Sequence, residues 1–78
     1  MKRIKVLGSG CANCVTTAKL IATKAKDLGI EVDIEKVTDV AAIMGYGVMS
    51  TPGVVIDGKV VHAGGIPAAV AVERWLRG

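Results

Sequence analysis

Residues 51–61 read TPGVVIDGKVV, and this stretch decides the fold. Asp57-Gly58 stands between two runs rich in β-branched residues, 54–56 and 60–62. An Asp-Gly pair in such a position is among the strongest local signals for a tight antiparallel hairpin. We therefore expect two short antiparallel strands here, preceded by a turn at residues 51–53.

Outward from the hairpin, the sequence predicts two further strands and three helices. The long helix begins at Cys11, and Gly29 supplies its left-handed terminating residue. Its expected buried stripe consists of Cys14, Val15, Ala18, Ile21, Ala22, Ala25 and Leu28, while Thr16, Thr17, Lys19, Thr23, Lys24 and Lys26 face the other way. The remaining expected elements are a strand at 2–7, a strand at 30–35, a short helix at 40–44 after Thr38-Asp39, and a last helix at 68–76 after Pro67.

These elements follow one another in the order β-α-β-α-β-β-α. The first two strands, joined by a helix, should be parallel with a right-handed crossover. Residues 30–35 alternate strictly between apolar and acidic, which is typical of a strand at a sheet edge. The sequence therefore predicts an α/β fold with a mixed four-stranded sheet flanked by helices, in a single domain over residues 1–78.

Composition and charge exclude several classes of function. The apolar fraction is 51%, with one Tyr, one Trp and no Phe, so the core is built of small side chains and offers no large cavity for a cofactor. No apolar run approaches the ~20 residues of a membrane span, and Lys5 interrupts what could imitate a signal peptide. The net charge is +3, and the sequence shows no dense cluster of basic residues of the kind that a nucleic-acid binder presents on one face. We expect a cytoplasmic protein. In that compartment a Cys pair is usually catalytic, redox-sensing or metal-binding.

The chemistry lies in residues 8–16, GSGCANCVT, which contain both cysteines of the chain. Cys11 stands between a strand and a helix, where the free N–H groups of the helix N-terminus favour a thiolate. Cys14 lies one turn further on, on the buried stripe. The pair could exchange electrons with another disulfide, or its two thiolates could hold Cu(I). A zinc site with four ligands would need two ligands besides the cysteines, and His62 is the only further candidate.

Residues 8–14 also resemble the Gly-x-x-Cys-x-x-Cys loop of heavy-metal-associated domains and copper chaperones. Those domains usually carry Met two residues before the first Cys, where this chain has Ser9. They follow a β-α-β-β-α-β order, whereas this chain places its hairpin late. Soft-metal binding therefore stays as the alternative reading.

The combination of Cys11-x-x-Cys14 with Thr51-Pro52 resembles the thioredoxin-like superfamily. More narrowly, CANC at 11–14 and YGVMSTPGVVIDGKVV at 46–61 resemble the small glutaredoxin-like "redox-active disulfide protein 2" proteins of prokaryotes. The resemblance covers residues 4–76 and implies a minimal thioredoxin fold. It also implies that Pro52 is a cis proline beside the dithiol and that Thr51 contacts the backbone of a substrate.

The function implied by this resemblance is thiol–disulfide exchange. Cys11 would attack the disulfide of a partner protein and Cys14 would resolve the mixed disulfide. Gly64-Gly65 resembles the glycine pair that holds the carboxylate of glutathione in glutaredoxins. The resemblance implies no cofactor other than the redox-active Cys11–Cys14 disulfide, and no metal.

The implied partners are proteins containing disulfides, together with a reductase or a low-molecular-weight thiol as electron donor. We expect a monomer that binds no nucleic acid and does not enter a membrane. A redox-sensing adaptor, whose dithiol regulates binding without turnover, is a further alternative.

The chain departs from thioredoxins proper around the cysteines. Gly10 stands in place of their Trp, and Ala12-Asn13 in place of their Gly-Pro. Residues 2–7 contain no Asp or Glu that could accept a proton from the buried Cys. We expect His62 to face solvent, Tyr46 and Met49 to pack in the loop before Pro52, and Trp75 to pack in the core.

Overall fold

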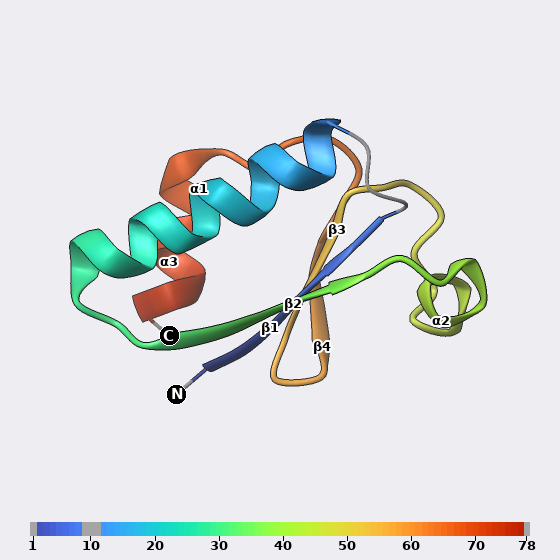
Figure 1. Cartoon of the computed structure of the whole chain (residues 1–78), viewed down its shortest axis with the longest axis horizontal. Helices are drawn as coiled ribbons and strands as arrows, with labels where there is room; N and C mark the ends of the chain where they lie inside the picture. The colour runs from blue at the N-terminus through green and yellow to red at the C-terminus, as the bar shows by residue number, and fades with distance from the viewer. Residues whose placement is uncertain (1, 9–11, 78) are drawn as a thin grey trace.

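The computed structural model describes residues 2–8 and 12–77, which form an α/β fold with a four-stranded sheet (Figure 1). The elements are β1 (Lys2–Leu7), α1 (Ala12–Leu28), β2 (Val32–Val37), α2 (Val40–Gly45), β3 (Gly53–Ile56), β4 (Lys59–Ala63) and α3 (Ala69–Arg77). This order is the expected β-α-β-α-β-β-α, and the fold class inferred from the sequence is confirmed.

The sheet has the strand order β2-β1-β3-β4. β1 pairs with β2 in parallel and with β3 in antiparallel orientation, and β3 and β4 form the antiparallel hairpin. β2 lies at a sheet edge, as its alternation of apolar and acidic residues indicates. The expected mixed sheet is therefore confirmed, with β1 and β3 at its centre.

The Asp-Gly turn joins β3 to β4 in the way the sequence predicts. Asp57 and Gly58 both have positive φ, 50° and 84°, which a two-residue turn between twisted strands requires. The turn is also tied to β1, because the Asp57 N–H donates to the Arg3 carbonyl at 2.8 Å. In return, the Arg3 N–H donates to Asp57 Oδ1 at 3.1 Å. The hairpin is thus fixed against β1 at this end.

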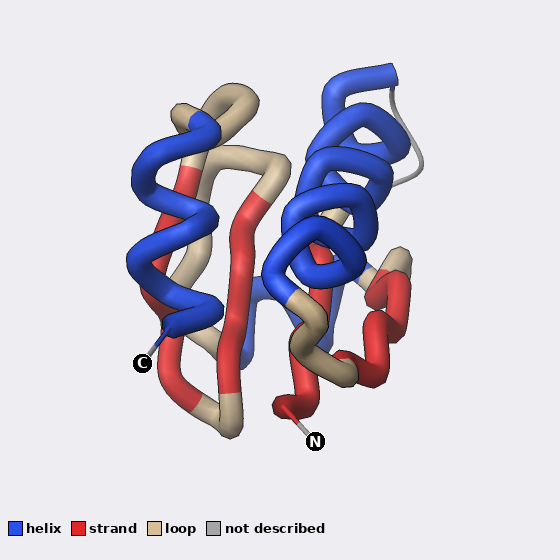
Figure 2. Tube along the Cα trace, turned by 90° about the vertical axis from the view of Figure 1, so that its left-hand side faces the viewer, coloured by secondary structure: helices blue, strands red, loops and turns tan. Residues whose placement is uncertain are grey.

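Helices α1 and α3 lie side by side over one face of the sheet, and the short α2 lies against the other (Figures 1 and 2). The main core lies between the sheet and the two longer helices; it consists of Ile4, Val6, Ala18, Ile21, Ala25, Val54, Ile56, Val72 and Leu76. A smaller core lies under α2 and contains Leu7, Ile43, Val48 and Val55. Trp75 packs at the margin of the main core, as expected.

The buried side of α1 differs from the expected stripe. Thr17 is fully buried, whereas Ala22 is exposed and Val15 is only half-buried. Thr17 can be buried because its hydroxyl donates to the Asn13 carbonyl at 2.8 Å, so its polar group keeps a partner. The prediction that Thr17 faces away from the core is therefore wrong.

The second strand also begins later than the sequence predicts. Gly29 adopts φ 67°, and the Ile30 N–H donates to the Ala25 carbonyl at 2.9 Å. This bond belongs to the terminating turn of α1, so Ile30 is not yet part of the sheet. β2 consequently spans Val32–Val37 and not residues 30–35.

Two valines on α3 test the contribution of the main core. Val72 is 0% exposed and Val70 is 65% exposed. We expect Val72→Ala to lower the free energy of unfolding by about 2 kcal/mol, because it removes buried methyl groups and leaves a cavity. Val70→Ala should change it by less than about 0.5 kcal/mol. Urea unfolding monitored by circular dichroism measures both; equal effects would contradict the assigned packing of α3.

Candidate active site

Three segments that are distant in sequence meet at Gly8. A Cβ added at this glycine would clash with the Cys14 Sγ and would lie 3.7 Å from the Thr51 Cβ. The Gly8 N–H donates to the Val37 carbonyl at 2.9 Å, which extends the pairing of β1 and β2 by one residue. The end of β1, the first turns of α1 and the segment before β3 are thereby brought into contact.

Cys14 is buried at this junction, with 6% of its surface exposed. Its placement on the buried side of α1 agrees with the helical spacing of the sequence. Cys11, the predicted nucleophile, lies outside the described residues. The structure thus defines the surroundings of Cys14, while the role of Cys11 remains a prediction from the sequence.

The Thr51–Pro52 peptide bond is cis, as the resemblance implies. Thr51 is exposed and Pro52 is fully buried, and β3 begins at the next residue. Gly53 pairs with Leu7 of β1 and Ala63 of β4 at the centre of the sheet. Thr51 therefore lies just before a central strand, and its Cβ and the Cys14 side chain both lie within 4 Å of the position that a Cβ at Gly8 would take.

The Gly64-Gly65 turn lies against the same proline segment. The Gly64 N–H donates to the Pro52 carbonyl at 3.0 Å. Both glycines have positive φ, 84° and 72°, and a Cβ at Gly64 would come within 3.2 Å of the Ser50 Cβ. A residue with a side chain is therefore disfavoured at position 64 on two grounds. The structure brings Gly64 next to Pro52, as a shared site requires.

His62 is half-buried, where the sequence analysis expects it to face solvent. Its half-buried ring contacts the Trp75 ring, with 5.8 Å between centroids, and its Nε2 lies 3.0 Å from the Gly65 carbonyl oxygen. The cause is an irregular register in the hairpin, where His62 pairs with Val54 and Val60 with Val55. Since directly paired residues share a face, His62 lies with Val54 on the side that α3 covers.

The loop between α2 and Pro52 is fixed at its beginning and its end. Tyr46 Oη accepts a hydrogen bond of 3.1 Å from Lys5 Nζ of β1, and this bond raises the pKa of Lys5 above its ordinary value. Further along, Val48 is buried, and its Cγ1 would be 3.0 Å from a Cβ at Gly53. Tyr46 packs as expected, and these contacts hold the backbone that leads to Thr51.

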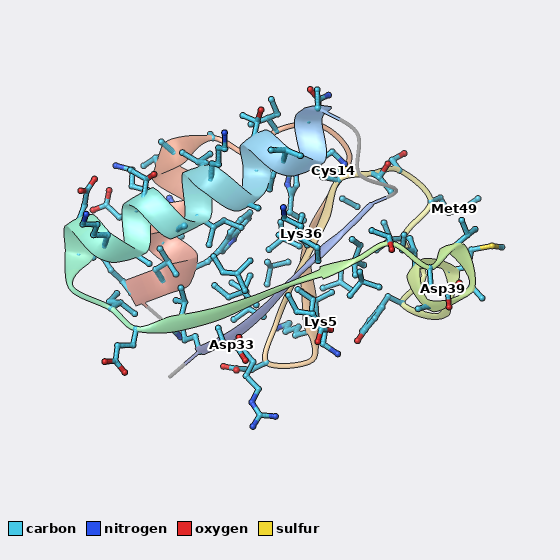
Figure 3. All side chains as sticks on the ribbon, viewed as in Figure 1. Lys5, Cys14, Asp33, Lys36, Asp39 and Met49 are labelled. Carbon is cyan, nitrogen blue, oxygen red and sulfur yellow. The ribbon has the colours of Figure 1, made fainter. Side chains whose placement is uncertain are left out.

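An apolar groove opens beside Thr51. It encloses about 520 Å³ and is lined by Val40, Ile43, Met44, Gly47, Val48, Met49 and Thr51. Met49 is 98% exposed, contrary to the expectation that it packs, and Met44 is 69% exposed. Figure 3 shows Met49 on the α2 side of the molecule, directed away from the sheet. Unbranched, polarisable methionine side chains suit binding surfaces that accommodate varied apolar groups.

The described residues bring together no group of three or more His, Cys, Asp or Glu side chains that could hold a metal ion. Within the same part of the chain, no helix combines the length and the hydropathy needed to cross a membrane.

Comparison with known proteins agrees with this geometry. The family model described as the thioredoxin domain matches residues 2–77, so the chain belongs to the thioredoxin family. A protein named thioredoxin from Methanocaldococcus jannaschii is 36% identical over 74 residues, covering 95% of this chain and 85% of the relative. One from Methanothermobacter thermautotrophicus is 30% identical over 76 residues, covering 97% and 99%. The fold is thus a minimal thioredoxin fold, and the chain is a thioredoxin-like redox protein.

Gly8 enters the sequence analysis only as part of the resemblance to metal-binding loops, which assigns it no role in the redox site. Its signal was its position directly after a strand and three residues before the first cysteine. A glycine there allows the backbone of β1 to approach the sulfur of Cys14.

We expect Gly8→Ala to lower the free energy of unfolding by about 1–3 kcal/mol, because the new methyl group displaces the Cys14 side chain. Gly45→Ala is the matched control, since a Cβ there meets nothing within 4 Å. Denaturant unfolding of the reduced proteins measures both changes. A Gly8→Ala variant as stable as wild type would show that β1 and Cys14 are not in close contact.

Proposed function

We propose that this protein is a thiol–disulfide oxidoreductase that uses Cys11 and Cys14 to reduce or exchange disulfides of partner proteins. The observation that supports this best is the convergence of Cys14, Gly8 and Thr51 beside the cis Pro52. In this arrangement the buried Cys14 near the start of α1 lies close to the exposed residue Thr51, which precedes a central strand.

The reaction follows from the positions of the two cysteines. Cys11 directly precedes α1, a helix of 17 residues whose N-terminal N–H groups favour a thiolate. The Cys11 thiolate attacks one sulfur of the partner disulfide, and the other sulfur leaves as a thiolate and takes up a proton. Cys14 then attacks the Cys11 sulfur, which releases the second partner thiol and leaves the Cys11–Cys14 disulfide. Two electrons pass from the protein to its partner.

The resulting disulfide is the only redox group that the cycle requires. A separate reductase or a low-molecular-weight thiol then returns the pair to the dithiol form. The positive φ of Gly64 and Gly65 turns their backbone at the edge of the site, against Pro52. This placement supports a role in contacting the partner, and it is compatible with glutathione as the electron donor.

The groove beside Thr51 supports protein segments as substrates. We propose that Thr51 pairs with an extended stretch next to the partner cysteine and that the groove receives an apolar side chain of that stretch. The groove is continuous with Thr51 itself, and Asp39 is the only charged residue in the sequence from 38 to 52. An uncharged segment with a Leu, Met or aromatic residue beside its cysteine is therefore the class of substrate that fits.

Mixed-disulfide trapping tests the exchange reaction. A Cys14→Ser variant should accumulate a covalent adduct with a disulfide-bonded protein through Cys11, because the resolving thiol is missing. Non-reducing electrophoresis and mass spectrometry detect the adduct. Wild type should show no accumulation and should turn over repeatedly with excess oxidised substrate and a reductant, and Cys11→Ser should form no adduct.

The alternatives give different results in the same experiment. A metal module would show no adduct with Cys14→Ser, whereas the reduced wild type would bind Cu(I) tightly with one ion per chain. A redox-sensing adaptor would be oxidised and reduced without multiple turnovers. Either result would contradict the proposed oxidoreductase.

Substitutions in the groove test the proposed substrate class. Met49→Gln should raise KM for a protein disulfide about 3- to 10-fold and leave the rate with a small aromatic disulfide unchanged, since only the protein reaches the groove. Val70→Gln is the control, because Val70 is comparably apolar and exposed but lies on α3. Equal changes for both substrates, or none, would argue against docking in the groove.

A further inference from the structure

A small cavity lies against Cys14, lined by residues of β1, β2 and the start of α1. Its volume is about 60 Å³, and it is lined by Val6, Gly8, Cys14, Val15, Lys36 and Thr38. This space is large enough to admit water. Cys14, Lys36 and Thr38 are the lining residues whose side chains carry polar or ionisable groups.

Lys36 reaches this cavity because of its register in β2. It pairs directly with Val6, and paired residues of neighbouring strands share a face of the sheet. Val6 belongs to the core under α1, so Lys36 lies on that same face. Figure 3 shows Lys36 rising from β2 on the side of the sheet that α1 covers.

The sequence of β2 is unusual at this position. Val32 and Ile34 precede Lys36 on the same face, and both pack against the core. The pattern therefore calls for a third apolar residue at 36, and a charged one stands there instead. Lys36 as a whole is exposed, so it lines the cavity while part of the side chain reaches solvent.

Lys36 is also the only charged residue among the described residues that line the cavity. Val6 of β1 and Gly8, which follows that strand, bring no charge to Cys14, and neither does Thr51. Cys11, three residues earlier in the sequence, is the other titratable group to consider. A proton that leaves Cys14 into this cavity thus meets the cation of Lys36, and no carboxylate belongs to the described lining.

We propose that Lys36 is a positioning residue that acts through Cys14, stabilising its thiolate at the moment when this sulfur resolves the mixed disulfide. The kinetic effect of Lys36 rests on the proposed oxidoreductase function, whereas its effect on the pKa of Cys14 can be measured without any substrate. The Cys14 thiol gives its proton to water in the cavity, and the ammonium of Lys36 attracts the resulting negative charge. The thiolate attacks Cys11, the Cys11–partner bond breaks, and the partner thiolate takes a proton from solvent.

The pKa of Cys14 is the direct test. In a Cys11→Ser background Cys14 is the only thiol, so its thiolate absorbance in the ultraviolet can be titrated without any substrate. Adding Lys36→Met should raise the Cys14 pKa by about 0.5–1 unit, a modest shift because the cation is partly in water. Lys36→Gln should give the same shift and guards against any effect of Met on packing, while Lys36→Arg should restore the original value.

Lys59→Met is the matched control for net charge. Lys59 begins β4 at the hairpin turn, at the opposite end of the sheet from Gly8, and its loss should leave the Cys14 pKa unchanged. An unchanged pKa in both Lys36 variants, or an equal shift with Lys59→Met, would overturn the proposal. These titrations are independent of trapping with Cys14→Ser, so failure of the function and failure of this inference are distinguishable.

The kinetic consequence has a characteristic dependence on pH. If the Cys14 pKa rises by about one unit, the thiolate fraction below that pKa falls about tenfold, and the higher intrinsic nucleophilicity recovers about threefold. Lys36→Met in the two-cysteine protein should therefore resolve a mixed disulfide about threefold more slowly at neutral pH. Above both pKa values it should be no slower than wild type. A defect of the same size at every pH would indicate a structural role and would contradict the proposal.

Discussion

The contact between the backbone of Gly8 and the sulfur of Cys14 is the constraint on which the rest of the site depends. A strand and a helix pack this closely only when the strand carries no side chain at the point of contact. Because Gly8 also bonds to the end of β2 and lies next to Thr51, one residue sets the relative positions of three segments. Cys14, the segment before Pro52 and the Lys36 cavity all lie around it.

The two faces of the sheet have different tasks in this small fold. The face under α1 and α3 carries the main core, and with it most of the apolar burial that stabilises the domain. The face under α2 is covered only near the ends of β1 and β3 that carry the site. Further from the site, this second face carries the exposed or half-exposed ion pair of Lys5 and Glu35 at 3.9 Å. A surface pair of this kind contributes little to stability. The loop before Pro52 is held by the hydrogen bond between Tyr46 and Lys5 and by the burial of Val48.

Much of the fold could be predicted from local signals. The Asp57-Gly58 turn, the strand at residues 2–7 and the helix end at Gly29 depend on backbone preferences within a few residues, and all are found. The failures have two causes, a long-range one for His62 and a local one for Thr17. His62 is turned inward by an irregular register between two strands, and Thr17 is buried because a hydrogen bond within the helix satisfies it. The roles proposed for Gly8 and Lys36 depend on contacts between segments, which spacing along one segment cannot reveal.

The central position of β1 has a consequence for how the chain acquires its structure. β1 pairs on one edge with β2, which lies about 30 residues further along the sequence. On its other edge it pairs with β3, which lies about 50 residues further along. Until β3 is made, Ile4 and Val6 lack Val54 and Ile56, and the α3 residues of the same core are absent as well. Closing such long loops costs entropy before any burial compensates for it. The first half of the chain is therefore not an independent folding unit, and during synthesis the sheet can form only after residues 51–61 have left the ribosome.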